Sequence, residues 1–119
     1  MISIIIPTYL NHKGLVECLE SVKKYTSGDY EVVVVANGAP EETRKLLMSA
    51  GCDSYDPSPL KYCPVKHIWF DQPLGFAKAV NEGIKASKGE YVVLLNDDCV
   101  LLPQPVNQWI ELLQGPFHE

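Results

Sequence analysis

The sequence lacks the features of a membrane-spanning or nucleic-acid-binding chain. None of its apolar runs approaches the roughly 20 residues that cross a bilayer, and no basic segment followed by an apolar core marks a signal peptide. The net charge is -5 and the lysines are scattered, so no basic stripe is available to follow a DNA or RNA backbone. We therefore expect a cytoplasmic protein, free or held at the inner face of the membrane by partners, that binds no nucleic-acid polymer.

Cysteine is present, but no CxxC pair occurs, which argues against a zinc knuckle. Cys18 falls on the apolar face of a predicted helix and Cys99 lies beside a strand end, positions where cysteine is commonly a small buried hydrophobe. Cys52 and Cys63 bracket a loop and, with His67, leave open a metal cluster or a disulfide. A disulfide is rare in a reducing compartment.

The composition suits one packed domain. Of the 119 residues 46% are hydrophobic and 21% are charged, which excludes a disordered or fibrous chain. The length supports a single core and is short for an enzyme that must hold two substrates. We therefore treat residues 1–119 as a single domain.

Apolar runs rich in β-branched residues alternate with stretches of helical periodicity. Strands are predicted at Ile2 to Ile6 (ended by Pro7), Tyr30 to Ala36, His67 to Phe70 and Glu90 to Leu95. Helices are predicted around Leu15 to Val22, at 41–50, at 75–88 with Phe76, Ala79, Val80 and Ile84 on one face, and at Val106 to Leu113. The order β-α-β-α-β-α-β-α predicts an α/β, Rossmann-like fold with crossover helices on a mostly parallel sheet.

Polar or turn-forming residues follow every predicted strand. They are Pro7-Thr8-Tyr9, Asn37-Gly38, 71–75 and Asn96-Asp97-Asp98. Parallel sheets bind ligands outside the carboxyl ends of their strands, so we expect these segments to converge on one rim.

The adjacent carboxylates Asp97 and Asp98 repel each other, and a shared proton, a cation or a hard metal ion relieves such repulsion. A divalent ion held by one carboxylate keeps several waters and reaches other ligands on a diphosphate, which indicates a nucleotide or nucleotide-sugar site. The alternative is an acidic turn exposed to solvent.

Several stretches, in order and spacing, resemble the N-terminal, nucleotide-binding half of family 2 glycosyltransferases with the GT-A fold. They are "SIIIPTY", "ECLESV", "EVVVVANG", "LGFAKAVNEGIKASKGEYVVLLNDD" and "VLLP", and only the loop from Cys52 to Lys66 falls outside the likeness. The resemblance implies an enzyme that binds a nucleotide-diphospho-sugar through a divalent metal for inverting transfer of the sugar to an unknown acceptor. A UDP- or dTDP-sugar is the expected donor, with a GDP-sugar as a further candidate.

The resemblance also implies roles for the residues that match the family's DxD-type motif. Asp98 would coordinate Mg2+ or Mn2+, and Asp97 would contact the ribose. Asn96 stands where many members have an Asp, which implies modest metal affinity.

The nucleotide base is expected near the first two strand ends. Pro7, Thr8 and Tyr9 match the family's base-binding turn, where the Tyr9 ring would stack on the base; ordinary packing is the alternative for Tyr9. Asn37 matches a region that commonly reads DDG or DNG in the family, whose acidic residue accepts the base's imide proton, but this chain reads Ala36-Asn37-Gly38 and lacks the acid. An Asn oxygen also accepts a hydrogen bond, but its neutrality weakens the case for a uracil-selective pocket.

Residues around the start of the third helix complete the expected site, each with a structural alternative. Gly75 would leave room for a diphosphate at the helix N-terminus or simply form a turn, and Lys78 would meet phosphate or base or lie on a solvated face. Asn81 would hydrogen-bond across the rim, and Asp71 would line the donor pocket or cap the helix.

The resemblance places the general base and the acceptor site beyond the DxD-type motif, and neither His118 nor Glu119 is nominated as the base. The chain is thus expected to be truncated after this motif and incomplete for turnover, with apolar surface at Trp109, Leu112 or Leu113 that drives self-association. The alternatives are a non-catalytic nucleotide-binding or interaction module of the same fold, and a receiver-like domain. A receiver carries its acidic pair after the first strand, unlike this chain.

Overall fold

The computed structural model describes residues 1–49 and 65–114, which form a four-stranded, wholly parallel sheet with crossover helices. The strands, in the spatial order β3-β2-β1-β4, are β1 (Ile2–Thr8), β2 (Tyr30–Asn37), β3 (Val65–Phe70) and β4 (Tyr91–Leu94). The helices are α1 (His12–Tyr25), α2 (Glu41–Ser49), α3 (Phe76–Ala86) and α4 (Gln108–Gln114). The predicted α/β fold and element order are confirmed, and the pairing of β4 with β1 differs from the receiver-type strand order.

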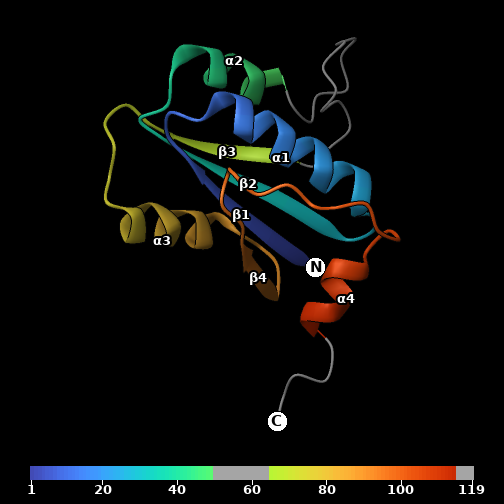
Figure 1. Cartoon of the computed structure of the whole chain (residues 1–119). Helices are drawn as coiled ribbons and strands as arrows, with labels where there is room; N and C mark the ends of the chain where they lie inside the picture. The colour runs from blue at the N-terminus through green and yellow to red at the C-terminus, as the bar shows by residue number, and fades with distance from the viewer. Residues whose placement is uncertain (50–64, 115–119) are drawn as a thin grey trace.

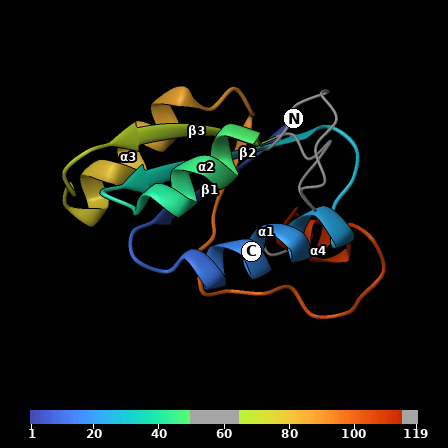
Figure 2. The same cartoon turned by 90° about the horizontal axis from the view of Figure 1, so that it is seen from above.

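Helices cover both faces of the sheet, with α1 on one side and α3 on the other (Figures 1 and 2). The strands supply alternate residues to the two sides. Ile4 and Val32 belong to the larger core cluster together with residues of α1, whereas Ile5 and Val33 pack with Ala79 of α3. This alternation explains why the two central strands are continuous apolar runs instead of mixed polar and apolar ones.

Strand β1 continues through Pro7 to Thr8, so the prediction that Pro7 ends the strand is wrong. The pairing with β4 covers only Ile2 to Ile5, and Pro7 lies beyond it. Proline has no N–H to donate, and it is tolerated here because β1 has no β4 partner at that position.

Helix α3 approaches the sheet through small residues. A Cβ built on Gly83 would lie 2.7 Å from a methyl of Ile5 and 2.9 Å from one of Val35, and Ala79 is fully buried. Of the apolar residues predicted to share one face of this helix, Phe76 and Ile84 are 58% and 42% exposed. Helix α3 thus contacts the sheet through Ala79 and Gly83, whereas the larger side chains of Phe76 and Ile84 remain exposed.

The segment after β4 returns along α1 and is tied to it at several points (Figure 2). The Leu101 amide donates to Ser21 Oγ at 3.0 Å, and the Asn107 amide donates to the Tyr25 carbonyl at 2.8 Å. The Trp109 indole N–H donates to Thr26 Oγ1 at 3.0 Å. Trp109 is therefore half-buried, because its ring packs on the core and its indole N–H has a partner, and the apolar surface expected in this region lies at Leu112 and Leu113, which are 56% and 59% exposed.

The cysteines divide between core and surface. Cys18 is fully buried on α1 as predicted, but Cys99 is exposed because it follows the carboxylates in a turn outside the strand. Cys52 and Cys63 lie outside the described residues, so the predicted metal cluster or disulfide with His67 does too. None of the helices within 1–49 and 65–114 has the length and hydropathy that a membrane crossing requires.

A buried acid fastens the amino-terminal end of the sheet. The Glu31 carboxylate accepts hydrogen bonds from Ser3 Oγ and the Lys88 amide, both at 2.6 Å, and pairs with Lys66 Nζ at 2.9 Å. Burial alone would raise the pKa of Glu31, but these partners stabilise its charged form and the pKa lies below its usual 4.5. Because Lys88 precedes β4, Glu31 joins the start of that short strand to the other three.

We predict that Glu31→Gln lowers the free energy of unfolding by about 2 kcal/mol at neutral pH, since it removes a charged acceptor from a nearly buried network. The lowered pKa makes this stabilisation complete above pH 4.5 and lost as the pH falls through the folded-state value. Urea unfolding at several pH values measures the difference. Glu82→Gln is the control, because the Glu82–Lys85 pair is more exposed, and an equal effect of both substitutions would contradict the assignment.

Candidate functional site

An open cleft of about 400 Å³ lies at the carboxyl ends of the strands. Its lining residues lie at or after the carboxyl ends of all four strands, and they are Pro7, Thr8, Tyr9, Asn37, Pro73, Leu74, Phe76, Asn96, Asp97 and Asp98. The predicted convergence on one rim is therefore observed. The cleft straddles β1 and β4, where the strand order reverses, and such a switch point is the usual ligand position in open α/β sheets.

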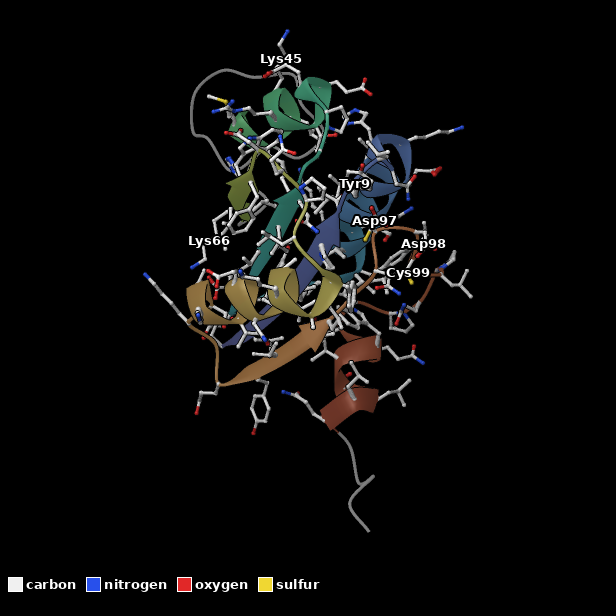
Figure 3. The ribbon with its side chains drawn as sticks, turned by 90° about the vertical axis from the view of Figure 1, so that its left-hand side faces the viewer. Tyr9, Lys45, Lys66, Asp97, Asp98 and Cys99 are labelled. Carbon is white, nitrogen blue, oxygen red and sulfur yellow. The ribbon has the colours of Figure 1, made fainter. Side chains whose placement is uncertain are left out.

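A side-chain hydrogen bond joins the two strands at this point. Thr8, which is 3% exposed, donates its hydroxyl to Asp97 Oδ2 at 2.8 Å. The Leu95 amide donates to the Ile5 carbonyl at 2.9 Å, which carries the β1–β4 pairing one residue past the strand. Figure 3 shows Asp97 beside Tyr9, with Asp98 farther along the same loop. Asp97 is thus fixed at the floor of the cleft.

Asp98 lies at the open side of the cleft and is exposed to solvent. Its Oδ1 accepts only a long contact, 3.9 Å, from Cys99 Sγ. Beneath the loop, burial raises the pKa of the Cys18 thiol to about 12, and Cys99, Asp97 and Asp98 add to the rise. The negative charges of Asp97 and Asp98 disfavour ionisation of the nearby Cys18 thiol, and they would favour a cation bound at the rim.

The chemistry of the carboxylate pair fits a hard divalent cation. Carboxylate oxygens are preferred ligands of Mg2+ and Mn2+. Across 1–49 and 65–114, no group of three or more His, Cys, Asp or Glu side chains is placed to enclose a metal ion. A cation at Asp97 and Asp98 would therefore take its other ligands from water and from a bound anion, the arrangement in which Mg2+ commonly holds a diphosphate.

Asn37 fixes the opposite wall of the cleft. Its side-chain oxygen accepts from the Leu74 amide at 2.6 Å, and its side-chain nitrogen donates to the Leu74 carbonyl at 2.9 Å. Gly38 has φ 77°, and a Cβ there would lie 2.9 Å from Pro73 Cδ. Asn37-Gly38 therefore clamps the loop before α3, a role that sequence reasoning missed. A hydrogen bond from a base would have to use the second lone pair of the Asn37 oxygen.

The remaining predicted residues lie outside the lining of the cleft. Gly75 precedes α3, where its carbonyl accepts from the Ala79 amide at 3.0 Å, and Lys78 and Asn81 are exposed on the helix. The Asp71 carboxylate accepts from the Trp69 indole at 2.8 Å. Sequence reasoning also missed Pro73, Leu74 and Phe76 as lining residues.

Comparison with known proteins gives a consistent family. The chain matches the model of glycosyl transferase family 2 over residues 3–118. It is 29% identical over 101 residues to the glycosyltransferase GlyG of Streptococcus pneumoniae, covering 85% of this chain and 31% of GlyG. It is 30% identical over 112 residues to the glycosyltransferase AglE of Haloferax volcanii, covering 92% of this chain and 33% of AglE. The chain spans about a third of the length of these curated relatives.

A solved structure shares the fold. The structure of residues 1–349 of Staphylococcus aureus TarS in complex with UDP matches with a TM-score of 0.66 and 25% sequence identity. The match covers 82% of this chain and 27% of that one. The Rossmann-like arrangement is therefore shared with this part of TarS.

We predict that Thr8 and Asp97 are energetically coupled. In a double-mutant cycle with Thr8→Val and Asp97→Asn, denaturant unfolding should give a coupling of about 1–2 kcal/mol, because the hydrogen bond has a charged acceptor. The matched cycle pairs Thr8→Val with Asp98→Asn and should give less than about 0.5 kcal/mol. Equal coupling in the two cycles would contradict the structural distinction between the aspartates.

Proposed function

Because the chain belongs to glycosyl transferase family 2, we propose that it forms the donor-binding part of an inverting glycosyltransferase. The observation that carries this proposal is the placement of Asp97 and Asp98 in an open cleft at the β1–β4 switch point. A nucleotide-diphospho-sugar matches this cleft in two ways. Its diphosphate would be bound through a cation at Asp97 and Asp98, and its flat base would contact the apolar residues that line the cleft.

The two aspartates have different proposed tasks. Asp98 is exposed and would hold Mg2+ or Mn2+, whereas Asp97 is oriented by Thr8 and would accept a hydrogen bond from the ribose. When bound, the cation would stabilise the negative charge of the diphosphate leaving group. Tyr9 follows Thr8 directly and would receive the base, and Pro7 and Asn37, which also line the cleft, are further proposed contacts to the nucleotide.

The proposed donor is a UDP- or dTDP-sugar, with a GDP-sugar as the further candidate. The likeness to TarS, whose structure contains UDP, supports a uridine donor. Gly75 and Lys78, near the cleft but not in its lining, are retained as proposed contacts to a longer ligand. The cytoplasmic location stays a prediction.

Inverting transfer also needs a general base for the acceptor hydroxyl. Among the described residues that line the cleft, the carboxylates are Asp97 and Asp98, and both are assigned to the donor. We therefore propose that the base is supplied from outside these residues, by a segment equivalent to the part of the relatives that this chain does not match.

A non-catalytic nucleotide-binding module is the second candidate. Two observations favour it: Ala36 stands where the resemblance leads one to expect an acid, and the neutral Asn37 amide beside it is hydrogen-bonded to Leu74. Binding of a nucleotide-sugar without transfer of its sugar would support the non-catalytic module. Transfer of the sugar to an acceptor would support the glycosyltransferase.

We predict that calorimetric titration detects metal-dependent binding of at least one of UDP, dTDP and GDP in the presence of Mn2+. Asp98→Ala should weaken this binding at least about 10-fold, because the cation loses its carboxylate ligand. Glu17→Ala, which removes an exposed carboxylate on α1, is the matched control and should leave the affinity unchanged. A nucleotide affinity that changes neither when Mn2+ is omitted nor when Asp98 is replaced would contradict the proposed role of the carboxylate.

We also predict self-association through the apolar surface of β4 and α4. Tyr91 and Leu113 are both 59% exposed and border a groove of about 400 Å³. Light scattering should detect a dimer or larger species, and Leu113→Asp should shift it toward the monomer. A monodisperse monomer of the unmodified chain would contradict this expectation.

A further inference from the structure

The apolar half of the cleft contains an aromatic ring that the core does not use. Phe76 is 58% exposed, belongs to neither core cluster and lines the cleft together with Pro73 and Leu74. A large exposed aromatic side chain at the first residue of a helix loses hydrophobic stabilisation that burial would give. Its position therefore calls for a reason outside the packing of the free protein.

The geometry of α3 explains why Phe76 reaches the cleft. Gly83 packs against Ile5 and Val35, and the helix runs from there toward the carboxyl ends of the strands (Figure 1). From Gly83 back to Phe76 the helix rises about 10 Å, while β1 extends about 10 Å beyond Ile5 and β2 about 7 Å beyond Val35. Phe76 therefore lies near the carboxyl ends of these strands, where it lines the cleft.

The wall that carries Phe76 is held in place before any ligand binds. Asn37 makes both of its hydrogen bonds to Leu74, and Gly38 packs directly on Pro73. The Gly38 amide also donates to the Phe70 carbonyl at 2.9 Å, which secures the beginning of the same loop. The loop and the first turn of α3 therefore present a rigid apolar surface.

The cleft has two chemically different parts. Tyr9, Leu74 and Phe76 supply apolar surface, and Asp97 and Asp98 supply negative charge. A nucleoside diphosphate has one flat apolar face, its base, and one polyanionic part that needs a cation at the carboxylates. The base is therefore the part of the ligand that suits the aromatic surface.

We propose that Phe76 is a base-binding residue, and that it and Tyr9 form the aromatic walls that enclose the base of the bound nucleotide. This inference rests on the proposed nucleotide-sugar function and adds a residue on α3 that selects for a flat ring over a free diphosphate. The contribution comes from stacking, which tolerates different bases, and so it sets affinity more than the choice among uracil, thymine and guanine.

The test compares Phe76→Ala with the unmodified chain in calorimetric titrations of UDP, dTDP, GDP and inorganic pyrophosphate, each with Mn2+. For the nucleotide that binds most tightly, Phe76→Ala should raise the dissociation constant about 5- to 50-fold, because one stacking surface is lost. Pyrophosphate has no base, so its binding should change less than about 2-fold. The dissociation constant of the nucleotide for Phe76→Leu should lie between those of the unmodified chain and Phe76→Ala, since leucine keeps apolar surface but lacks the ring.

Ile84→Ala is the matched control, because Ile84 is a 42% exposed apolar residue on the same helix outside the cleft. It should leave nucleotide binding unchanged, and a thermal melt of each variant verifies the fold. Unchanged nucleotide binding in Phe76→Ala, or equal weakening of nucleotide and pyrophosphate, would overturn the role of Phe76 and leave the proposed function standing. Failure of the unmodified chain to bind any nucleotide would overturn both.

Discussion

The pairing of β4 with β1 is the constraint on which the rest of the molecule depends. It places the loop after β4 beside the end of β1, and the hydrogen bond from Thr8 to Asp97 joins the two loops across the switch point. Because Asp97 is held by Thr8, the adjacent Asp98 is left facing the open side of the cleft. The β1–β4 pairing thus leaves Asp97 fixed by a hydrogen bond and the neighbouring Asp98 accessible to solvent.

Strand β4 is only four residues long, and other interactions keep it in register. At its beginning the Lys88 amide is bound by the buried Glu31, and the Gly89 amide donates to Ser3 Oγ at 2.8 Å. After its end the chain is tied along α1 as far as Asn107, whose side-chain oxygen accepts from the Ser27 amide at 2.9 Å. These contacts lie away from the cleft, so the scaffold can be stabilised without occupying the groups that are proposed to bind ligand (Figure 3 shows Lys66, the partner of Glu31, apart from Tyr9 and Asp97).

The sequence predicted the fold well because its signals are local and repeated. Period and length identify each strand and helix, and the rule for parallel sheets places the strand ends together without knowledge of any contact. The features that the sequence did not predict concern neighbours distant in the chain. The burial of Trp109 depends on Thr26, the exposure of Phe76 depends on how closely Gly83 approaches the sheet, and the double hydrogen bond of Asn37 depends on a loop 37 residues away. No periodicity encodes such relations.

The central claim is that the cleft at the switch point binds a nucleotide through a cation at the carboxylates, and paramagnetic broadening tests the location directly. In a two-dimensional amide spectrum of the 15N-labelled protein, trace Mn2+ added with UDP, dTDP or GDP should broaden the resonances of Thr8, Tyr9 and Asp98 first. The amides of Glu31 and Lys88, at the far end of the sheet, should stay sharp. Broadening that is centred away from Asp98, or that is the same with and without every nucleotide, would contradict the account.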